Sequence, residues 1–209
     1  MERTGPQGHF LPMLSLALTG GIATGKSTFA RHFRELAPQT RFFDCDACVH
    51  ELLATPEVVA EVAQALGDVC AADGTLDRAK MRVLVFENTE RRRALEGILH
   101  PRVRAQCAAA QEQAGAEGAE FFLADVPLLY ESGWPLPRDL EIVVACTATE
   151  QRARLMARSG LAADAAERII AAQLPLEEKM RRADVVMWNG GAPDSLRRQT
   201  ELFPGWLRT

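Results

Sequence analysis

One segment of the sequence, GGIATGKS at residues 20–27, constrains the fold more than any other, because structured patterns flank it on both sides. Residues 14–19, LSLALT, are apolar and typical of a buried parallel strand. Residues 26–36 carry apolar side chains at helical spacing. A G-x-x-x-x-G-K-[ST] pattern between a strand and a helix is typical of a phosphate-binding loop. The segment therefore predicts a site for a nucleotide polyphosphate.

The residue types of this loop fit phosphate chemistry. Glycines let backbone N–H groups converge on phosphate oxygens, and the helix N-terminus adds about half a positive charge. In such loops the lysine, here Lys26, contacts the β- and γ-phosphates, and the hydroxyl group, here of Ser27, is a ligand of Mg²⁺. We expect ATP and Mg²⁺ to bind, with nucleotide contacts from Gly21, Ile22, Ala23, Thr24, Gly25, Lys26, Ser27 and Thr28.

The order of the predicted elements indicates an α/β fold with a parallel sheet. Further strands are predicted at residues 41–44, 120–124, 140–146 and 183–188. Helices are predicted at 57–66 after Pro56, 78–86 after Asp77, 102–114 after Pro101, from a Thr149 cap to residue 158, at 163–172 and from about Pro193. Strands that alternate with helices favour right-handed crossovers. The helical block at 48–115 is too long for one crossover, so it is predicted to be an insertion.

Composition narrows the classes of protein. The chain has 209 residues and a formal charge of −4, which argues against binding a nucleic-acid duplex. Its five cysteines lack the spacing of a disulfide framework, which indicates reduced thiols and a cytoplasmic protein. No run approaches the roughly 18 apolar residues of a membrane span. Residues 1–13 lack the apolar region of a secretory signal and are expected to be a disordered lead-in.

Two carboxylates follow the second predicted strand. Asp44 and Asp46 are placed at the carboxyl edge, where open α/β sheets bind ligands. An aspartate there accepts a proton from a substrate hydroxyl or holds Mg²⁺ through water, and for Asp46 a helix N-cap is the alternative. Cys45 and Cys48 flank Asp46 with His50 nearby, but no second pair completes a zinc site. We therefore expect these cysteines to be packing residues.

A basic segment follows the fourth predicted strand. Arg154 and Arg158 are four residues apart on one face of a helix, and Arg152 and Arg168 add charge to the same segment. A mobile helical flap of this kind closes over phosphates and excludes water, as a kinase requires. A solvated basic face is the alternative interpretation.

Taken in order over residues 16–202, the motifs resemble those of the dephospho-coenzyme A kinase family. They are LTGGIATGKS at 18–27, DCDA at 44–47, DGTLDR at 73–78, VF at 85–86, LEGILHPRVR at 95–104, DVPLLYE at 125–131, Gln151 with Arg154 and Arg158, Gln173, Lys179, and ADVVMWNGG at 183–191. The family's usual loop is GGIGSGKS, so Ala23 and Thr24 are departures, and Ala23 is expected not to enter the positive-φ region freely. Cys45 replaces the common alanine of Asp-Ala-Asp and leaves both carboxylates in place.

The resemblance implies a reaction and three structural parts. The reaction is transfer of the γ-phosphoryl group of ATP to the ribose 3′-hydroxyl of dephospho-coenzyme A. The parts are a nucleotide-binding core at 14–47, 119–149 and 176–209, a helical substrate-binding insertion at 48–118 and a helical lid at 150–175. The implied partner is this small molecule, with neither nucleic acid nor a membrane.

The resemblance also implies residue roles. Asp46 matches the family's proposed general base, and Lys26 and Arg154 complete the catalytic set. Further ATP contacts are expected from Arg158, Asn189 and Gly190, although a tight turn explains the last two almost as well. Acceptor contacts are expected from Asp44, Arg78, Arg82, His100, Arg104 and Asp125. For His100, which precedes Pro101, a helix cap is the alternative.

Two other functions stay open on residues alone. One is a kinase for a different small acceptor, such as a nucleoside monophosphate or a sugar acid. The other is a nucleotide-binding switch without an acceptor. The aspartates and the paired arginines favour a kinase over a switch, and the sequence contains no Asn-Lys-x-Asp motif. The blocks DGTLDR and LHPRVR favour the coenzyme A precursor, but only through the resemblance.

Overall fold

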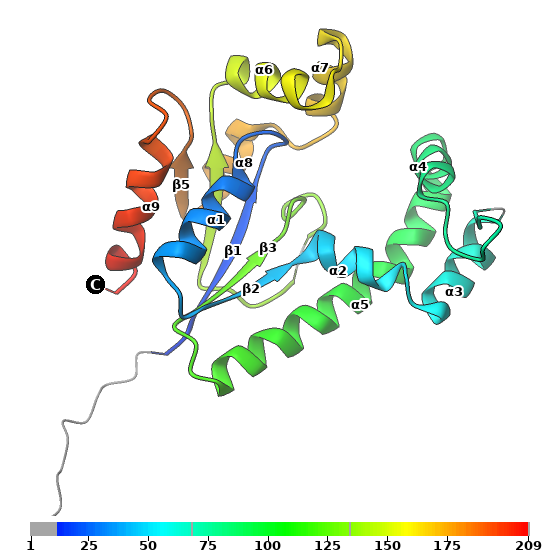
Figure 1. Ribbon diagram of the computed structural model, residues 1–209, viewed down its shortest axis with the longest axis horizontal. Coiled ribbons are helices and arrows are strands. Elements are labelled where there is room, and N and C mark those ends of the chain that lie inside the picture. The colour runs from blue at the N-terminus through cyan, green and yellow to red at the C-terminus, as the bar shows by residue number, and fades with distance from the viewer. Residues whose placement is uncertain (1–11, 68, 134, 209) are drawn as a thin grey trace, which may run out of the picture.

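The computed structural model describes residues 12–67, 69–133 and 135–208. Its centre is a five-stranded parallel sheet with the order β2-β3-β1-β4-β5 (Figure 1). The strands are β1 (Leu14–Gly20), β2 (Thr40–Asp44), β3 (Phe121–Asp125), β4 (Leu140–Ala145) and β5 (Val185–Trp188). The predicted five-stranded α/β fold is confirmed. Because β1 is the central strand, the loop that follows it lies in the middle of the carboxyl edge.

Helices cover both faces of the sheet. Leu16 and Leu18 of β1 join a buried cluster with aromatic side chains of α1 (Lys26–Leu36) and α9 (Ser195–Trp206). Ala17, between them, belongs to the cluster on the opposite face, because successive side chains of a strand point to opposite sides. Burial on both faces explains why the strands read as continuous apolar runs.

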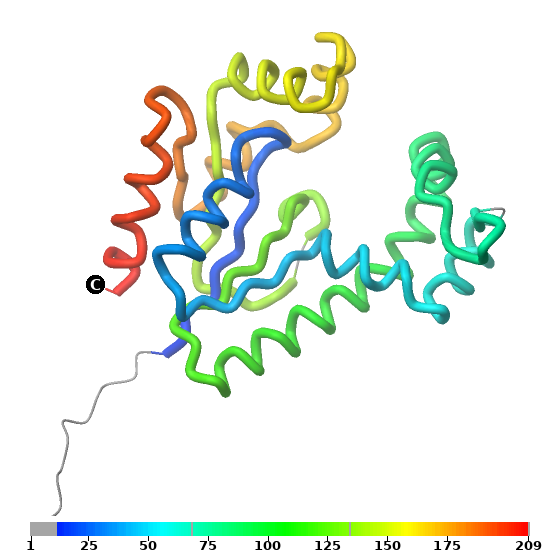
Figure 2. Tube along the Cα trace, viewed as in Figure 1, coloured from blue at the N-terminus to red at the C-terminus, as the bar shows by residue number. Residues whose placement is uncertain are grey.

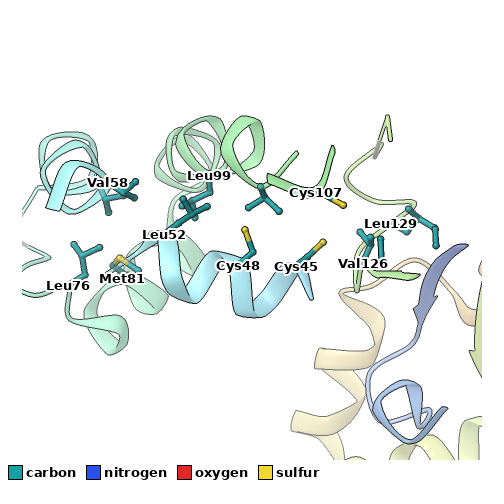
Figure 3. Close-up of a cluster of buried hydrophobic side chains, with 14 of the residues drawn as sticks. Cys45, Cys48, Leu52, Val58, Leu76, Met81, Leu99, Cys107, Val126 and Leu129 are labelled. Atoms are coloured by element: carbon teal, nitrogen blue, oxygen red, sulfur yellow. The ribbon is translucent and has the colours of Figure 1, made fainter. Parts of the chain in front are cut away.

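The chain between β2 and β3 forms a helical insertion. It contains α2 (Cys45–Leu52), α3 (Pro56–Leu66), α4 (Arg78–Glu87) and α5 (Thr89–Ala116). Figures 1 and 2 show α3 and α4 beyond the edge of the sheet, with α5 returning from them to it. One buried cluster runs from Val58 and Leu76 in the insertion to Val126 beside the sheet (Figure 3). The insertion is therefore joined to the sheet by a shared core.

The prediction that a helix begins after Pro101 is wrong. Helix α5 begins after Asn88, whose side chain accepts two backbone N–H groups of the first turn, and continues through the proline for 28 residues. Pro101 leaves the Gly97 carbonyl without its helical N–H donor. The buried side chains of Leu99 and Val103 flank the proline, so packing on this face outweighs the missing hydrogen bond.

The chain after β4 forms three further helices. They are α6 (Ala148–Ser159), α7 (Ala163–Ala171) and α8 (Leu176–Arg182), and α6 and α7 lie at the top of Figure 1. The predicted cap at Thr149 is wrong, because Thr147 and Glu150 form a capping box two residues earlier. Within the described part of the chain, no helix is both long and apolar enough to cross a membrane.

Candidate active site

The loop after β1 is held by side-chain amides from distant parts of the chain. Gln151 of α6 donates to the Ile22 carbonyl at 2.9 Å, and Gln173 Oε1 accepts the Ile22 N–H at 2.9 Å. Asn189, which follows β5, donates to the Thr24 carbonyl at 2.8 Å. The loop is thus tied both to the α6–α7 segment and to the last strand, so its N–H groups are preorganised for a ligand.

Two loop residues have positive φ angles. Gly25 has a φ of 103°, and a Cβ at this position would lie 1.9 Å from Asn189 Nδ2, so only glycine fits. Ala23 has a φ of 60°, which contradicts the expectation that alanine would avoid this region. The N–H and hydroxyl of Thr24 both donate to the Gly21 carbonyl, at 3.3 and 2.9 Å, and this tight turn holds Ala23 in the left-handed region. The strain costs about 1–2 kcal/mol, which the turn offsets.

Charged side chains meet where the loop enters α1. Lys26 Nζ forms an ion pair with Asp125 Oδ1, at the end of β3. Asp44, the register partner of Asp125 on β2, accepts the Ala47 N–H at 3.0 Å and therefore caps α2. The N-cap alternative for Asp46 is wrong, because Asp46 lies inside the first turn. Its carboxylate makes no hydrogen bond to the residues that the structure describes.

Two carboxyl groups near Lys26, those of Asp46 and Asp125, have raised pKa values. The cleft walls withdraw Asp46 from water, which raises its pKa; Lys26 acts in the opposite direction and Asp44 in the same direction. Burial also raises the pKa of Asp125, in spite of its ion pair with Lys26. Three carboxylates around one ammonium group leave an excess of negative charge, which favours a bound cation.

Asp46 lies at the junction of three cavities. The loop cavity, of about 470 Å³, is walled by the loop after β1 and by Arg154. The α5 cavity, of about 270 Å³, lies between α2 and α5 and includes His100. The α4 cavity, of about 290 Å³, includes Arg78 and Arg82. Because Asp46 lines all three, it separates the phosphate-binding loop from two cavities of the insertion.

The arginines of the α6–α7 segment divide into two groups. Arg154 and Arg158 both line the loop cavity. Arg158 forms no ion pair with any residue in the described ranges, and Arg154 is 3.5 Å from the Glu150 carboxylate. Arg152, in contrast, pairs with Glu167 at 2.7 Å on the exposed side. The solvated-face interpretation therefore fits Arg152, whereas Arg154 and Arg158 face the place where phosphates would bind.

The insertion brings several of the predicted acceptor residues to the cavities. Arg78 contacts His50 Nδ1, and both line the α4 cavity beside Arg82. His100 lines the α5 cavity from within α5, so the helix-cap alternative for this residue is wrong. These four basic side chains line the two cavities of the insertion that meet at Asp46.

Three predicted site residues make structural contacts with neighbouring residues. Arg104 donates to the Ser132 carbonyl at 3.4 Å. Asn189 supports the loop after β1 through the contact described above. Gly190 is packed so closely that an added Cβ would lie 2.7 Å from Trp188 Nε1. These contacts give the three residues structural roles, and their predicted contacts with ATP or the acceptor stay predictions.

The comparison with known sequences identifies the family. The sequence model of the dephospho-CoA kinase family matches residues 14–194. The chain belongs to the dephospho-CoA kinase family. It is 46% identical over 191 residues to the dephospho-CoA kinase of Symbiobacterium thermophilum, an alignment that covers 90% of this chain and 79% of that protein. The dephospho-CoA kinase of Anaeromyxobacter dehalogenans is 42% identical, with 94% of this chain and 93% of that protein covered.

Solved structures share the fold of the chain. A crystal structure of a Thermus thermophilus protein superposes with a TM-score of 0.79 at 31% identity, covering 94% of this chain and 99% of that one. The dephospho-CoA kinase from Campylobacter jejuni has the same fold, with a TM-score of 0.60, 24% identity and coverage of 94% and 98%. The chain is therefore an ATP-dependent kinase.

The structure adds an ion pair, buried at its lysine end, to which the sequence assigned no role. Lys179 of α8 is fully buried, pairs with Glu131 at 2.8 Å and donates to the Gly20 carbonyl at 3.2 Å. Glu131 also accepts the Leu174 N–H at 2.9 Å. Burial raises the pKa of Glu131, but hydrogen bonds from Lys179 and Leu174 outweigh it, so the net shift is downward. In this kinase the pair ties the start of the phosphate loop to the wall of the α5 cavity.

Lys179→Met is expected to lower the free energy of unfolding by about 1–3 kcal/mol, because it leaves the Gly20 carbonyl and the partly exposed Glu131 carboxylate without their donor. Urea unfolding measures the change. The matched control is Arg181→Met, two residues away on α8, where an exposed side chain pairs with Glu178, and little change is expected. The double variant Lys179→Met/Glu131→Leu should recover part of the loss. Equal stability of the Lys179 and Arg181 variants would contradict the prediction.

Proposed function

We propose that the chain transfers the γ-phosphoryl group of ATP to the ribose 3′-hydroxyl of dephospho-CoA and releases CoA and ADP. The observation that carries the proposal is the position of Asp46, which lines the loop cavity and both acceptor-side cavities. A base at this junction reaches a hydroxyl on one side and a terminal phosphate on the other. Membership of the family supplies the identity of the acceptor.

The proposed nucleotide site is the loop cavity. The backbone N–H groups of the loop other than those of Ile22 and Thr24, which are already bonded, are suited to hold the phosphates at the start of α1. Lys26 contacts the β- and γ-phosphates, which requires its ammonium group to turn from Asp125 or to bridge the two. Arg154 and Arg158 face the same cavity and offset the charge that develops on the transferred group.

The loop cavity also fits a divalent cation held partly by the nucleotide. Ser27 and Asp46 line it, and the carboxylate excess around Lys26 favours positive charge. In the described ranges, no group of three or more His, Cys, Asp or Glu side chains is arranged to hold a metal. Mg²⁺ in kinases uses phosphate oxygens and water as further ligands, so Ser27 suffices as a direct protein ligand. When bound, Mg²⁺ neutralises charge on the phosphates.

Asp46 is proposed as the base. Its carboxylate orients the 3′-hydroxyl and accepts its proton as the bond from the hydroxyl oxygen to the γ-phosphorus forms. The bond from that phosphorus to the bridging oxygen breaks, and ADP leaves. The raised pKa of Asp46 brings its proton affinity closer to that of a useful base at neutral pH.

The proposal divides the chain by task. Residues 14–47, 119–149 and 176–209 form the nucleotide-binding core, residues 48–118 the acceptor-binding insertion, and residues 150–175 the lid. The Gln151 and Gln173 contacts with Ile22 support the lid assignment, because closure of α6 and α7 would act directly on the phosphate loop. All five cysteines are free thiols, which fits a reaction of CoA synthesis in the cytoplasm.

An acceptor screen tests the proposal. The purified chain is incubated with ATP, Mg²⁺ and dephospho-CoA, AMP, shikimate or no acceptor, and the products are weighed by mass spectrometry. Dephospho-CoA should gain one phosphate group, and nuclease digestion should place it on the 3′-oxygen. Phosphorylation of AMP or shikimate in preference to dephospho-CoA would show a kinase for another acceptor. ATP hydrolysis without any acceptor product would favour a nucleotide switch.

A further inference from the structure

A fourth cavity continues the line of cavities that begins at Asp46. Figure 1 shows α2 leading from the end of β2 toward α3 and α4. The α5 and α4 cavities share Asp46 and Val49, on one side of α2. The α4 cavity shares Leu53 and Arg78 with the next one, which we call the α3 cavity. Along α2, the loop cavity and the α5 cavity therefore come first, at Asp46. The α4 cavity follows, and the α3 cavity comes last, beside Leu53.

The α4 cavity has the chemistry of an anion site. His50, Arg78 and Arg82 line it, and Arg82 has no ion-pair partner in the described part of the chain. Arg78 and Arg82 are four residues apart on α4, so both guanidinium groups project from one face. Of the described residues that line the wall, Asp46 alone is acidic, and it also lines the loop cavity. A diphosphate fits this site better than an uncharged group does.

The α3 cavity differs from the α4 cavity in chemistry. It has a volume of about 720 Å³, and most of its wall is apolar, including Val59, Ala60 and Leu76. Among its described lining residues Asp73 is the one acidic residue, and it is engaged by Thr75, whose N–H and hydroxyl donate to the carboxylate at 3.0 and 2.7 Å. A cavity of this size with few free polar groups suits a long uncharged chain.

We propose that the α3 cavity, walled by α3 and the loop at residues 70–78, is the subsite for the pantetheine arm of the acceptor. This inference rests on the proposed function. Dephospho-CoA carries ribose, diphosphate and pantetheine in that order, and the cavities offer a base, a cationic site and an apolar site in the same order. Arg78, shared by the last two cavities, stands where the diphosphate joins the arm.

A side chain that fills the α3 cavity tests the subsite. Ala60 is exposed on α3 and lines the cavity, so Ala60→Trp obstructs the arm without replacing a buried residue. The matched control is Ala65→Trp, which is exposed on the same helix but lies about 140° around its axis. Ala60→Trp should lower kcat/KM for dephospho-CoA by roughly tenfold, as expected from losing the burial of about two methylene groups. ATP affinity and the melting temperature should match those of the control.

A second measurement does not depend on turnover. Cys70 lines the α3 cavity and is the one partly exposed cysteine of the five. The rate at which iodoacetamide alkylates Cys70 is measured by peptide mass mapping, with Cys70→Ser as the assignment control. S-methyl-dephospho-CoA, whose thiol is blocked, should slow alkylation several-fold. The methyl ester of ADP, which keeps the ribose and diphosphate but lacks the arm, should not slow it.

The outcomes separate the subsite from the proposed function. If the unmodified chain phosphorylates dephospho-CoA and Ala60→Trp behaves like Ala65→Trp, the arm does not occupy the α3 cavity and the inference is overturned. Equal alkylation rates with and without S-methyl-dephospho-CoA overturn it as well. If the unmodified chain does not phosphorylate dephospho-CoA, the proposed function is refuted, and the alkylation experiment alone decides the subsite.

Discussion

Asp46→Asn is expected to lower the turnover of dephospho-CoA by roughly 10²–10⁴-fold while ATP affinity changes little. The substitution keeps the size of the side chain and removes the negative charge that a base requires. Asp46 accepts no hydrogen bond within the described ranges, so asparagine disturbs no existing contact. Turnover, ATP affinity and melting temperature are measured together. The reduction should appear in kcat as well as in kcat/KM, because the lost interaction acts in the transition state.

Asp44→Asn is the matched control for the adjacent carboxylate. Asp44 caps α2 through the Ala47 N–H, a hydrogen bond that an asparagine oxygen also accepts, and it lines none of the three cavities at Asp46. We expect a smaller loss of turnover and a change in stability of only a few tenths of a kcal/mol. Normal turnover in Asp46→Asn with an inactive Asp44→Asn would move the base to Asp44. Full activity in both would leave Asp125 as the next residue to test.

The fold was predictable where the periodicity of the sequence is local. The strand before the phosphate loop and helix α1 follow directly from apolar spacing. Helix α5 was misread because Pro101 is a strong local signal, whereas the packing of Leu99 and Val103 that overrides it is tertiary. Local helix propensity does not take into account packing against other parts of the protein. Such errors therefore arise where burial decides whether a helix continues or ends.

The residue types of the candidate site could be predicted from the sequence, but the hydrogen bonds that hold the phosphate loop in place could not. The motif identified Lys26, and the strand end identified the pair of carboxylates. The contacts that Gln151 and Gln173 make with Ile22 join residues 129 and 151 positions apart, and no spacing rule predicts such pairs. The division of tasks between the carboxylates also needed the structure, because only the geometry shows which one caps α2.

Lys26→Met is expected to reduce phosphoryl transfer by ~10²-fold or more in a protein that still folds. Lys26 belongs to the phosphate-binding motif and lines the loop cavity. Its ammonium group also forms an ion pair with Asp125, at the end of β3. Methionine retains most of the aliphatic stem, so packing is largely preserved. The variant leaves Asp125 without its ion-pair partner, but the pKa of this carboxyl is already raised, so it can take up a proton instead of remaining as an unpaired charge.

The double variant Lys26→Met/Asp125→Asn separates two ways in which the lysine can act. If Lys26 stabilises the transferred phosphate, the double variant stays as inactive as Lys26→Met, because no cation has been restored. If Lys26 serves only to neutralise Asp125, removing both charges should restore turnover, and the phosphate-contact role would be wrong. Asp125→Asn alone calibrates the comparison, since it frees the ammonium group from its ion pair. Single-turnover transfer to dephospho-CoA, with ATP affinity measured in parallel, distinguishes loss of chemistry from loss of binding in all three variants.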